Sequence, residues 1–134
     1  MGDVIQPASL PKPEPYSLGY KVGNMLWVAG QTAVGEDGKI VGPGDPRAQA
    51  ECIYRRIGII LKEAGATPQD VTMIRTYTTD MRYQPMIREV RAAFFGSHKP
   101  ASTSVQVVAL ASPEYLLEVE VFAVIGSRLG LVPE

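Results

Sequence analysis

The sequence predicts a single α+β domain in which two helices cover one face of a mixed β-sheet. Two segments repeat apolar residues at helical spacing, whereas the other regular segments alternate apolar and polar residues or are rich in β-branched side chains. Across the 134 residues these segments follow the order β-β-(β)-α-β-α-β-β. Two helices cannot cover both faces of a sheet this wide, so we expect both to pack on one face.

Composition limits the classes of function. Apolar residues make up 46% of the chain and charged residues 20%, which is typical of a folded globular protein. The formal net charge is −1 and no basic stripe is present, so we expect no nucleic-acid partner. No apolar run is long enough to span a membrane, and residues 1–4 do not resemble the start of a signal peptide. We therefore expect a soluble, cytoplasmic protein without a membrane partner.

The N-terminal part is predicted to be extended and then to form a hairpin. Four prolines keep residues 1–15 out of a helix. Strands are expected over residues 16–22 and 25–30. The Gly-Asn pair at 23–24 suits the two-residue turn of a hairpin, since both residue types tolerate positive φ.

A tight turn at residues 35–38 and a short returning strand at 39–41 are predicted to precede the first helix. Asp45 can supply the N-cap carboxylate, and Pro46 suits the first helical position. Gly65 suits the position just past the C-terminal end. The apolar stripe of this helix comprises Ile53, Ile57, Ile60, Leu61 and Ala64.

A further strand and a second helix follow. Residues 71–79 are rich in β-branched residues and tyrosine, which favours a strand. The second helix is predicted to begin near Pro85 and to end at Gly96. Its apolar stripe comprises Ile87, Val90, Phe94 and Phe95.

Two late strands, residues 99–107 and 116–122, are predicted to form a hairpin-like pair. Alternation along the second strand predicts one face of Leu117, Val119, Val121 and Ala123. The opposite face carries Leu116, Glu118, Glu120 and Phe122. That face is too apolar to be left exposed to water, so we expect self-association through it. Residues 126–134 are predicted to be a coil tail.

One cysteine and one histidine restrict the available chemistry. Cys52 and His98 cannot make a metal site of the usual four-ligand kind, so no metal is expected. Cys52 lies close to the apolar stripe of the first helix, which favours a buried filler over a nucleophile. His98 follows the second helix and is interpreted as a surface loop residue.

Eight short motifs follow one another along nearly the whole chain. They are Pro15-Tyr16-Ser17, Val22-Gly23-Asn24-Met25, Val28-Ala29-Gly30-Gln31, Glu63-Ala64-Gly65, Thr78-Thr79-Asp80-Met81, Phe94-Phe95-Gly96, Lys99-Pro100-Ala101 and Leu117-Glu118-Val119-Glu120-Val121. In their order and spacing they resemble the Rid family (RidA/YjgF, reactive intermediate deaminases).

The resemblance implies a chorismate-mutase-like (YjgF-like) fold and a homotrimer with its pockets between neighbouring subunits. It also implies a small-molecule carboxylate substrate. The best-known members of the family hydrolyse enamines or imines, such as 2-aminoacrylate and its imine, to 2-oxo acids and ammonia. They use neither a metal nor an organic cofactor.

The resemblance also implies which residues form the site. Glu118 matches the family's pocket glutamate and is the expected catalytic residue. Tyr16 and Gly30 match substrate-binding positions, and Ala29 stands where the family usually has serine. Ser102 stands where the family's deaminases have an arginine that binds the substrate carboxylate, and serine cannot make the same bidentate contact.

The loss of that arginine leaves the source of a binding cation open. Arg88, which aligns with a pocket asparagine of the family, either supplies the cation from the second helix or is a solvent-facing charge. Ser102, Thr103 and Ser104 either contribute hydroxyls to a polar pocket wall or are only strand formers.

Two classes of function follow. In the first, the protein is a Rid-like hydrolase of a small enamine or imine acid, in which Glu118 performs acid–base work with a pKa raised by burial beside Leu116 and Phe122. A dicarboxylate of the 2-aminomuconate type would suit a relocated cation. The alternative is a non-catalytic trimeric Rid paralogue that binds a small ligand. Ribonuclease activity, attached to some relatives, has little support from a chain of charge −1.

Overall fold

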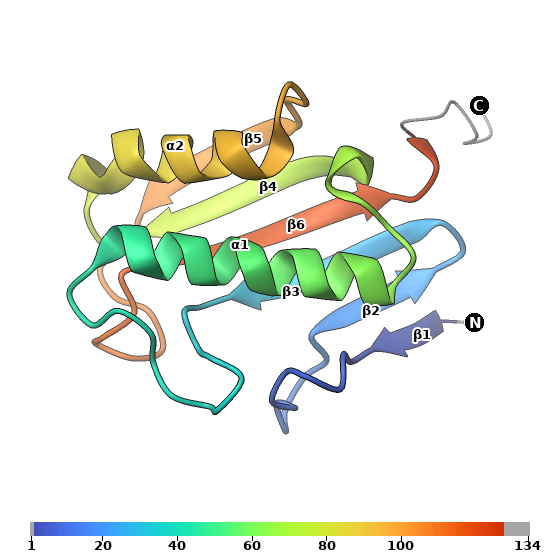
Figure 1. Cartoon of the computed structure of the whole chain (residues 1–134), viewed down its shortest axis with the longest axis horizontal. Helices are drawn as coiled ribbons and strands as arrows, with labels where there is room; N and C mark the ends of the chain where they lie inside the picture. The colour runs from blue at the N-terminus through green and yellow to red at the C-terminus, as the bar shows by residue number, and fades with distance from the viewer. Residues whose placement is uncertain (1, 128–134) are drawn as a thin grey trace.

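The computed structural model describes residues 2–127 and shows two helices packed side by side on one face of a β-sheet (Figure 1). The predicted fold class, α+β with both helices on one face of a mixed sheet, is therefore confirmed. The helices are α1 (Pro46–Glu63) and α2 (Gln84–Phe95), with short 3₁₀ turns η1 (Pro68–Asp70) and η2 (Met81–Tyr83). The strands are β1 (Gly2–Ile5), β2 (Gly19–Val22), β3 (Met25–Gln31), β4 (Val71–Thr78), β5 (Ala101–Gln106) and β6 (Leu117–Val124).

The strands lie in the order β1-β2-β3-β6-β4-β5. β4 and β5 run parallel, whereas the other neighbouring strands are antiparallel. The predicted hairpin of the two late strands is wrong, because β4 lies between β5 and β6. The cause is α2, which connects β4 to β5. A helical crossover returns the chain parallel to the strand it left, and β6 then takes the other side of β4.

Two smaller predictions also need correction. The extended N-terminal segment contains a strand, β1, which pairs with β2 from Gly2↔Val22 to Ile5↔Gly19. Residues 39–41 form no strand, and only an isolated bridge joins Val34 to Ile40. Residues 128–134 of the predicted coil tail lie outside the described residues.

The first helix begins and ends where the sequence predicts. The Asp45 carboxylate accepts a hydrogen bond from the Ala48 backbone N–H at 3.1 Å, and Pro46 is the first helical residue. Gly65 follows the C-terminal end with φ of +79°, a conformation that glycine adopts without strain. Between residues 2 and 127 no helix is long and apolar enough to cross a membrane.

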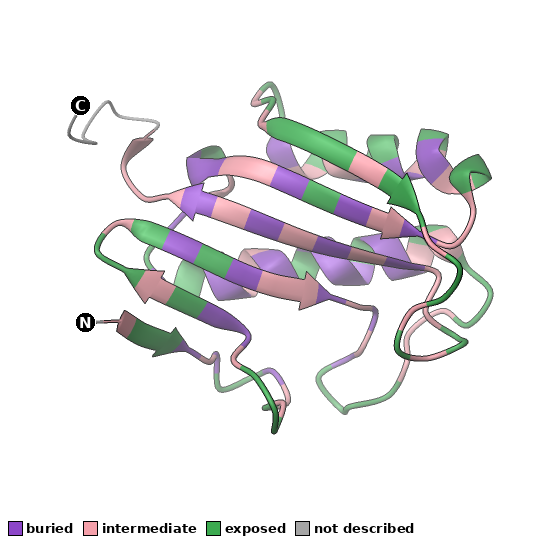
Figure 2. Cartoon of the chain, turned by 180° about the vertical axis from the view of Figure 1, so that it is seen from behind, coloured by how far each residue is buried: buried purple, intermediate pink, exposed green. Residues whose placement is uncertain are grey.

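The two faces of β6 differ as the alternation predicts. On the helix-covered face, Leu117, Val119, Val121 and Ala123 are all buried in the core. On the other face, Glu118, Glu120 and Phe122 are half-buried. We call this second surface the open face; Figure 2 shows it with the helices behind the sheet. The prediction that Leu116 lies on the open face is wrong. Leu116 precedes β6 and packs against the core.

Large apolar side chains gather on the open face. Trp27 is 45% exposed and Tyr20 44% exposed. Trp27 lies opposite Phe122 across β3 and β6, with ring centroids 5.2 Å apart. In the single chain these rings contact each other but remain accessible to water.

Candidate active site on the open face

Glu118 and Gly30 meet where β3 leaves regular pairing with β6. The register shifts between Val28 and Gln31, which is the local geometry of a bulge. A Cβ atom built on Gly30 would lie 2.7 Å from Cδ and from Oε2 of Glu118. With any other residue at position 30, the Glu118 carboxylate would have to move away from the backbone.

The Glu118 carboxylate has no hydrogen bond or ion pair within residues 2–127. Burial raises its pKa above the usual value of 4.5, and the neighbouring charge of Glu120 raises it further. The direction of the shift agrees with the expectation. A carboxyl group with a raised pKa and no partner is suited to donate and accept protons.

Glu120 lies on the same face of β6 as Glu118, but its carboxylate has bonding partners. The Tyr77 hydroxyl donates a 2.6 Å hydrogen bond to Glu120 Oε1, and Nη1 of Arg75 lies 3.6 Å from the same atom. This hydrogen bond to Glu120 is the main reason that the pKa of Tyr77 is raised. A hollow of about 200 Å³ adjoins Glu120, with Ala29, Trp27 and Phe122 among its walls.

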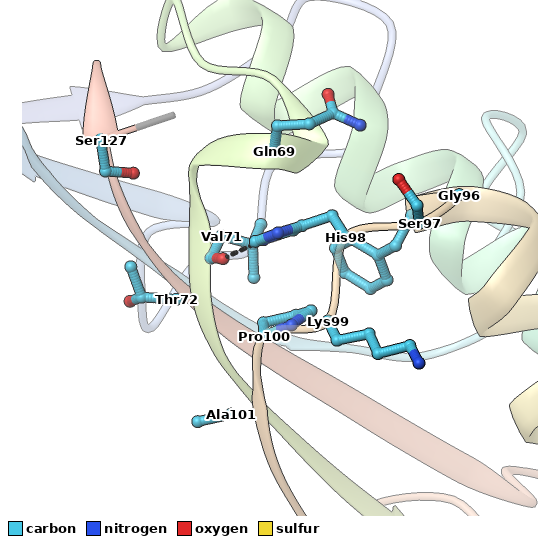
Figure 3. A pocket seen from close by; sticks show the side chains of 11 residues that line it. Gln69, Val71, Thr72, Gly96, Ser97, His98, Lys99, Pro100, Ala101 and Ser127 are labelled. Carbon is cyan, nitrogen blue, oxygen red and sulfur yellow. Dashed lines mark hydrogen bonds between the residues drawn. The ribbon is translucent and has the colours of Figure 1, made fainter. Parts of the chain in front are cut away.

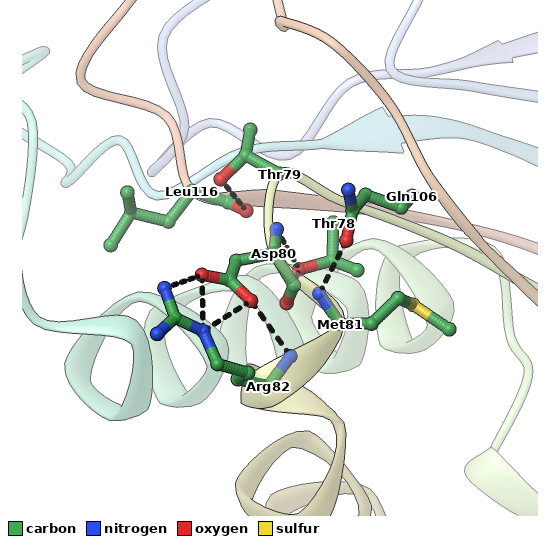
Figure 4. A network of polar contacts seen from close by, with 7 residues as sticks. All are labelled: Thr78, Thr79, Asp80, Met81, Arg82, Gln106 and Leu116. Atoms are coloured by element: carbon green, nitrogen blue, oxygen red, sulfur yellow. Dashed lines mark hydrogen bonds and ion pairs between the residues drawn. The ribbon is translucent and has the colours of Figure 1, made fainter.

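A polar network positions the end of β4 and the start of β6 (Figure 4). The Asp80 carboxylate accepts hydrogen bonds from the Arg82 backbone N–H and side chain, and these bonds lower the pKa of Asp80. The Thr79 hydroxyl donates to the Leu116 carbonyl at 3.2 Å. Gln106 Oε1 accepts from the Met81 backbone N–H at 2.8 Å and adds the end of β5 to the network. The residue before β6 is therefore held in place only two positions from Glu118.

Arg88 and Ser102 lie on the opposite, helix-covered side of the sheet. Ser102 pairs with the buried Ile74 in the parallel register, so both point toward α2, and Ser104 pairs in the same way with buried Thr76. Arg88 and Ser102 line one pocket of about 240 Å³. The cation that contacts Ser102 is Arg91, whose Nη1 donates to Oγ at 3.1 Å.

Arg91 escaped the sequence prediction, although its signal was present. It follows Arg88 by three residues, and residues three apart share one side of a helix. Lys99 also lines this pocket, so three cations surround it.

Tyr16 occupies a third location. It lines a cavity of about 160 Å³ together with Arg56, a residue that the sequence prediction did not include. The available signal was a charged residue at position 56 inside the apolar stripe, next to Ile57 and three residues after Ile53. Arg56 is only 7% exposed. Within one chain, the proposed site residues therefore lie in separate places: Gly30 and Glu118 lie close together on the open face, Arg88 and Ser102 line a pocket behind the sheet, and Tyr16 lines another cavity.

A further cavity, of about 800 Å³, lies elsewhere, where β4 and β5 begin (Figure 3). None of the predicted site residues lines it. His98 lines this cavity, and Nε2 of its ring donates a hydrogen bond to the Val71 carbonyl at 2.7 Å. His98 is in a loop, as predicted, but half-buried and attached to β4 rather than free on the surface.

Cys52 is buried, as predicted, and burial raises the pKa of its thiol. A thiol in that state is a poor nucleophile. Across residues 2–127, no cluster of three or more histidine, cysteine, aspartate or glutamate side chains could hold a metal ion.

Comparisons with known proteins agree with this fold. Residues 7–125 match the family model described as endoribonuclease L-PSP. A RutC family protein from Pyrococcus abyssi is 39% identical over 123 residues, which is 90% of this chain and 95% of that protein. The 3-aminoacrylate deaminase RutC from Acinetobacter baylyi is 33% identical over 118 residues, covering 87% and 93%. The crystal structure of RidA from an Antarctic Psychrobacter species superposes with a TM-score of 0.85 at 30% identity, covering 92% and 99%.

Proposed function

Because this chain belongs to the Rid/YjgF family, we propose that it is a hydrolase that deaminates a small enamine or imine acid to an oxo acid and ammonia. The observation that carries the proposal is the contact between Gly30 and Glu118 on the open face. It leaves a carboxyl group with a raised pKa, and with no hydrogen-bond partner among residues 2–127, beside the half-buried backbone of Gly30.

The chemistry assigned to Glu118 is general acid–base catalysis. In its protonated form the carboxyl gives its proton to the enamine carbon, and the enamine C=C–N becomes an iminium ion. The resulting carboxylate then takes a proton from the water that adds to the iminium carbon, which gives a carbinolamine and restores the protonated carboxyl. The carbinolamine hydroxyl gives up its proton and becomes the carbonyl of the oxo acid, and the amino nitrogen gains a proton as the C–N bond breaks. One enamine and one water thus become one oxo acid and one ammonia.

Among relatives, the deaminase RutC is named for 3-aminoacrylate, a small enamine acid, and this supports the substrate class. Ser102 replaces the family's carboxylate-binding arginine, so the substrate of this chain could also be a longer acid that binds through other cations. Arg88, Arg91 and Lys99 surround the pocket that Ser102 lines, and these cations suit a second carboxylate of the 2-aminomuconate type.

We also propose that the protein is a homotrimer with its sites between subunits. Two features support this assembly. The open face exposes large apolar side chains, and β5 is an exposed edge strand. Association of copies would cover both and would bring the pocket behind β5 of one subunit near the open face of another. Light scattering should give three times the mass of the chain, and a monomer would contradict this assembly.

The activity is tested by following ammonia release from 2-aminoacrylate, 3-aminoacrylate and 2-aminomuconate, each generated enzymatically and supplied with EDTA present. We expect release from at least one. Glu118→Gln should reduce it by about 10²–10⁴-fold, because a general acid–base group is lost. Glu120→Gln is the matched control, since it makes the same change two residues away on the same face.

Two results would contradict the proposal. If none of the three compounds releases ammonia yet one binds saturably, the non-catalytic paralogue is correct. If Glu120→Gln abolishes turnover while Glu118→Gln retains it, the catalytic assignment is wrong.

A further inference from the structure

Arg56 is a buried cation without an acidic partner among residues 2–127. Its Nε donates to Gln31 Oε1 and its Nη1 donates to the Val34 carbonyl, both at 2.9 Å. Its Nη2 has no hydrogen-bond partner among the residues that the structure describes. The side chain reaches the cavity of about 160 Å³ that lies between the N-terminal loop, α1, the segment after β3 and the connection before β6.

The charge around this cavity is unbalanced. Lys12 also lines it, and neither Lys12 nor Arg56 forms an ion pair with any residue from 2 to 127. No aspartate or glutamate is among the lining residues. Burial lowers the pKa of Arg56, which reflects the cost of keeping a charge away from water. Buried charges in proteins are normally paired, so an anion is the missing component.

The other residues that line the cavity indicate which kind of anion it would bind. Tyr16 and Tyr115 contribute phenol groups whose hydroxyls make no hydrogen bond in the described part of the chain. Prolines, Leu18 and Val34 supply an apolar lining, and Thr32 is the remaining lining residue. A ligand with one carboxylate and a compact apolar body matches these walls better than a phosphate, which needs polar groups on several sides.

We propose that this cavity binds a small organic acid, with its carboxylate held by Arg56 and Lys12 and its apolar body between Tyr16 and Tyr115. The inference goes beyond the proposed function, because Glu118 does not line the cavity and no turnover is required. Although Tyr16 is also a candidate for the substrate of the hydrolase, binding here can be measured separately.

Isothermal titration calorimetry with benzoate, acetate and inorganic phosphate, at constant ionic strength in chloride, tests the proposal. We expect saturable binding of benzoate, weaker binding of acetate and weaker still of phosphate. Arg56→Gln should weaken benzoate binding by at least about tenfold, because a desolvated charge contact is lost. Arg55→Gln is the matched control, since Arg55 is the exposed next residue of α1, outside the cavity.

Arg56 also holds Gln31 and Val34, so the Arg56→Gln variant requires a check of folding by circular dichroism. Lys12→Ala avoids this difficulty, because Lys12 is exposed, and it should weaken benzoate binding several-fold without loss of structure. Glu118→Gln should bind benzoate as the wild type does.

Three results would overturn the inference. They are the absence of saturable carboxylate binding, phosphate binding tighter than benzoate binding, and unchanged affinity in both Arg56→Gln and Lys12→Ala. Failure to release ammonia from the enamine substrates would refute the hydrolase alone and would leave this site intact.

Discussion

The two faces of β6 show how one strand serves two purposes. Leu117, Val119 and Ala123 are completely buried under the helices, whereas Glu118 and Glu120 remain half-buried on the open face. The covered face contributes stability through close packing. On the open face, a carboxyl group can keep a perturbed pKa and still reach a ligand. Neighbouring residues in the sequence therefore differ in function because their side chains point in opposite directions.

The largest expected effect is on the covered face. Leu117→Ala should lower the free energy of unfolding by about 2–5 kcal/mol, because it removes transfer energy and leaves a cavity. Urea denaturation measures this change. Glu118→Gln, one residue further along β6, should change stability by no more than about 0.5 kcal/mol. If both variants lost the same free energy of unfolding, the two faces of β6 would not differ in their contribution to stability.

An intermediate effect is expected at the contact on the open face. Gly30→Ala places a methyl group against the Glu118 carboxylate and should lower kcat/KM for enamine hydrolysis at least about tenfold. Glycine to alanine at position 58 is a suitable comparison. There a Cβ would lie 3.4 Å from the Phe94 ring, an ordinary contact, and deaminase activity should be unchanged. Full activity in Gly30→Ala would show that the close approach is not needed.

The smallest effect concerns pH. Because the pKa of Glu118 is raised above 4.5, the folded protein binds this proton more tightly than the unfolded chain does. The stabilising effect is fully present below 4.5, and it is lost as the pH rises through the folded pKa. Glu118→Gln should remove this part of the pH dependence of unfolding.

The same reasoning applies to catalysis. If protonated Glu118 gives its proton to the enamine, the rate should fall as the pH rises above its pKa. Glu120→Gln removes a neighbouring negative charge, so it should lower the pKa of Glu118 and move this fall to lower pH. A fall that moves to higher pH would contradict the electrostatic assignment.

Local patterns identified much of the fold. Asp45, Pro46 and Gly65 bound α1 correctly, because capping depends on a few adjacent residues. Alternation correctly separated the core face of β6 from Glu118. The position of β5 could not be found by looking for nearby strands, since the crossover through α2 decides its neighbour.

The candidate site was predictable only in part. The motifs pointed to Gly30 and Glu118, which are in contact. They did not reveal that Ser102 and Arg88 lie across the sheet from Glu118, or that Arg91 contacts Ser102. Arg56 carried a signal, a charged residue inside an apolar stripe, but its burial depends on what packs against the helix.

The sequence by itself determined the two helices, the limits of α1, most of the strands, the alternation of β6 and the family to which the chain belongs. Each of these follows from residue type and spacing over short distances. Only the tertiary structure decided which strands are neighbours, which charges lack a partner and which side of the sheet each candidate residue faces. These depend on contacts between segments far apart in the chain, whose geometry no local pattern contains.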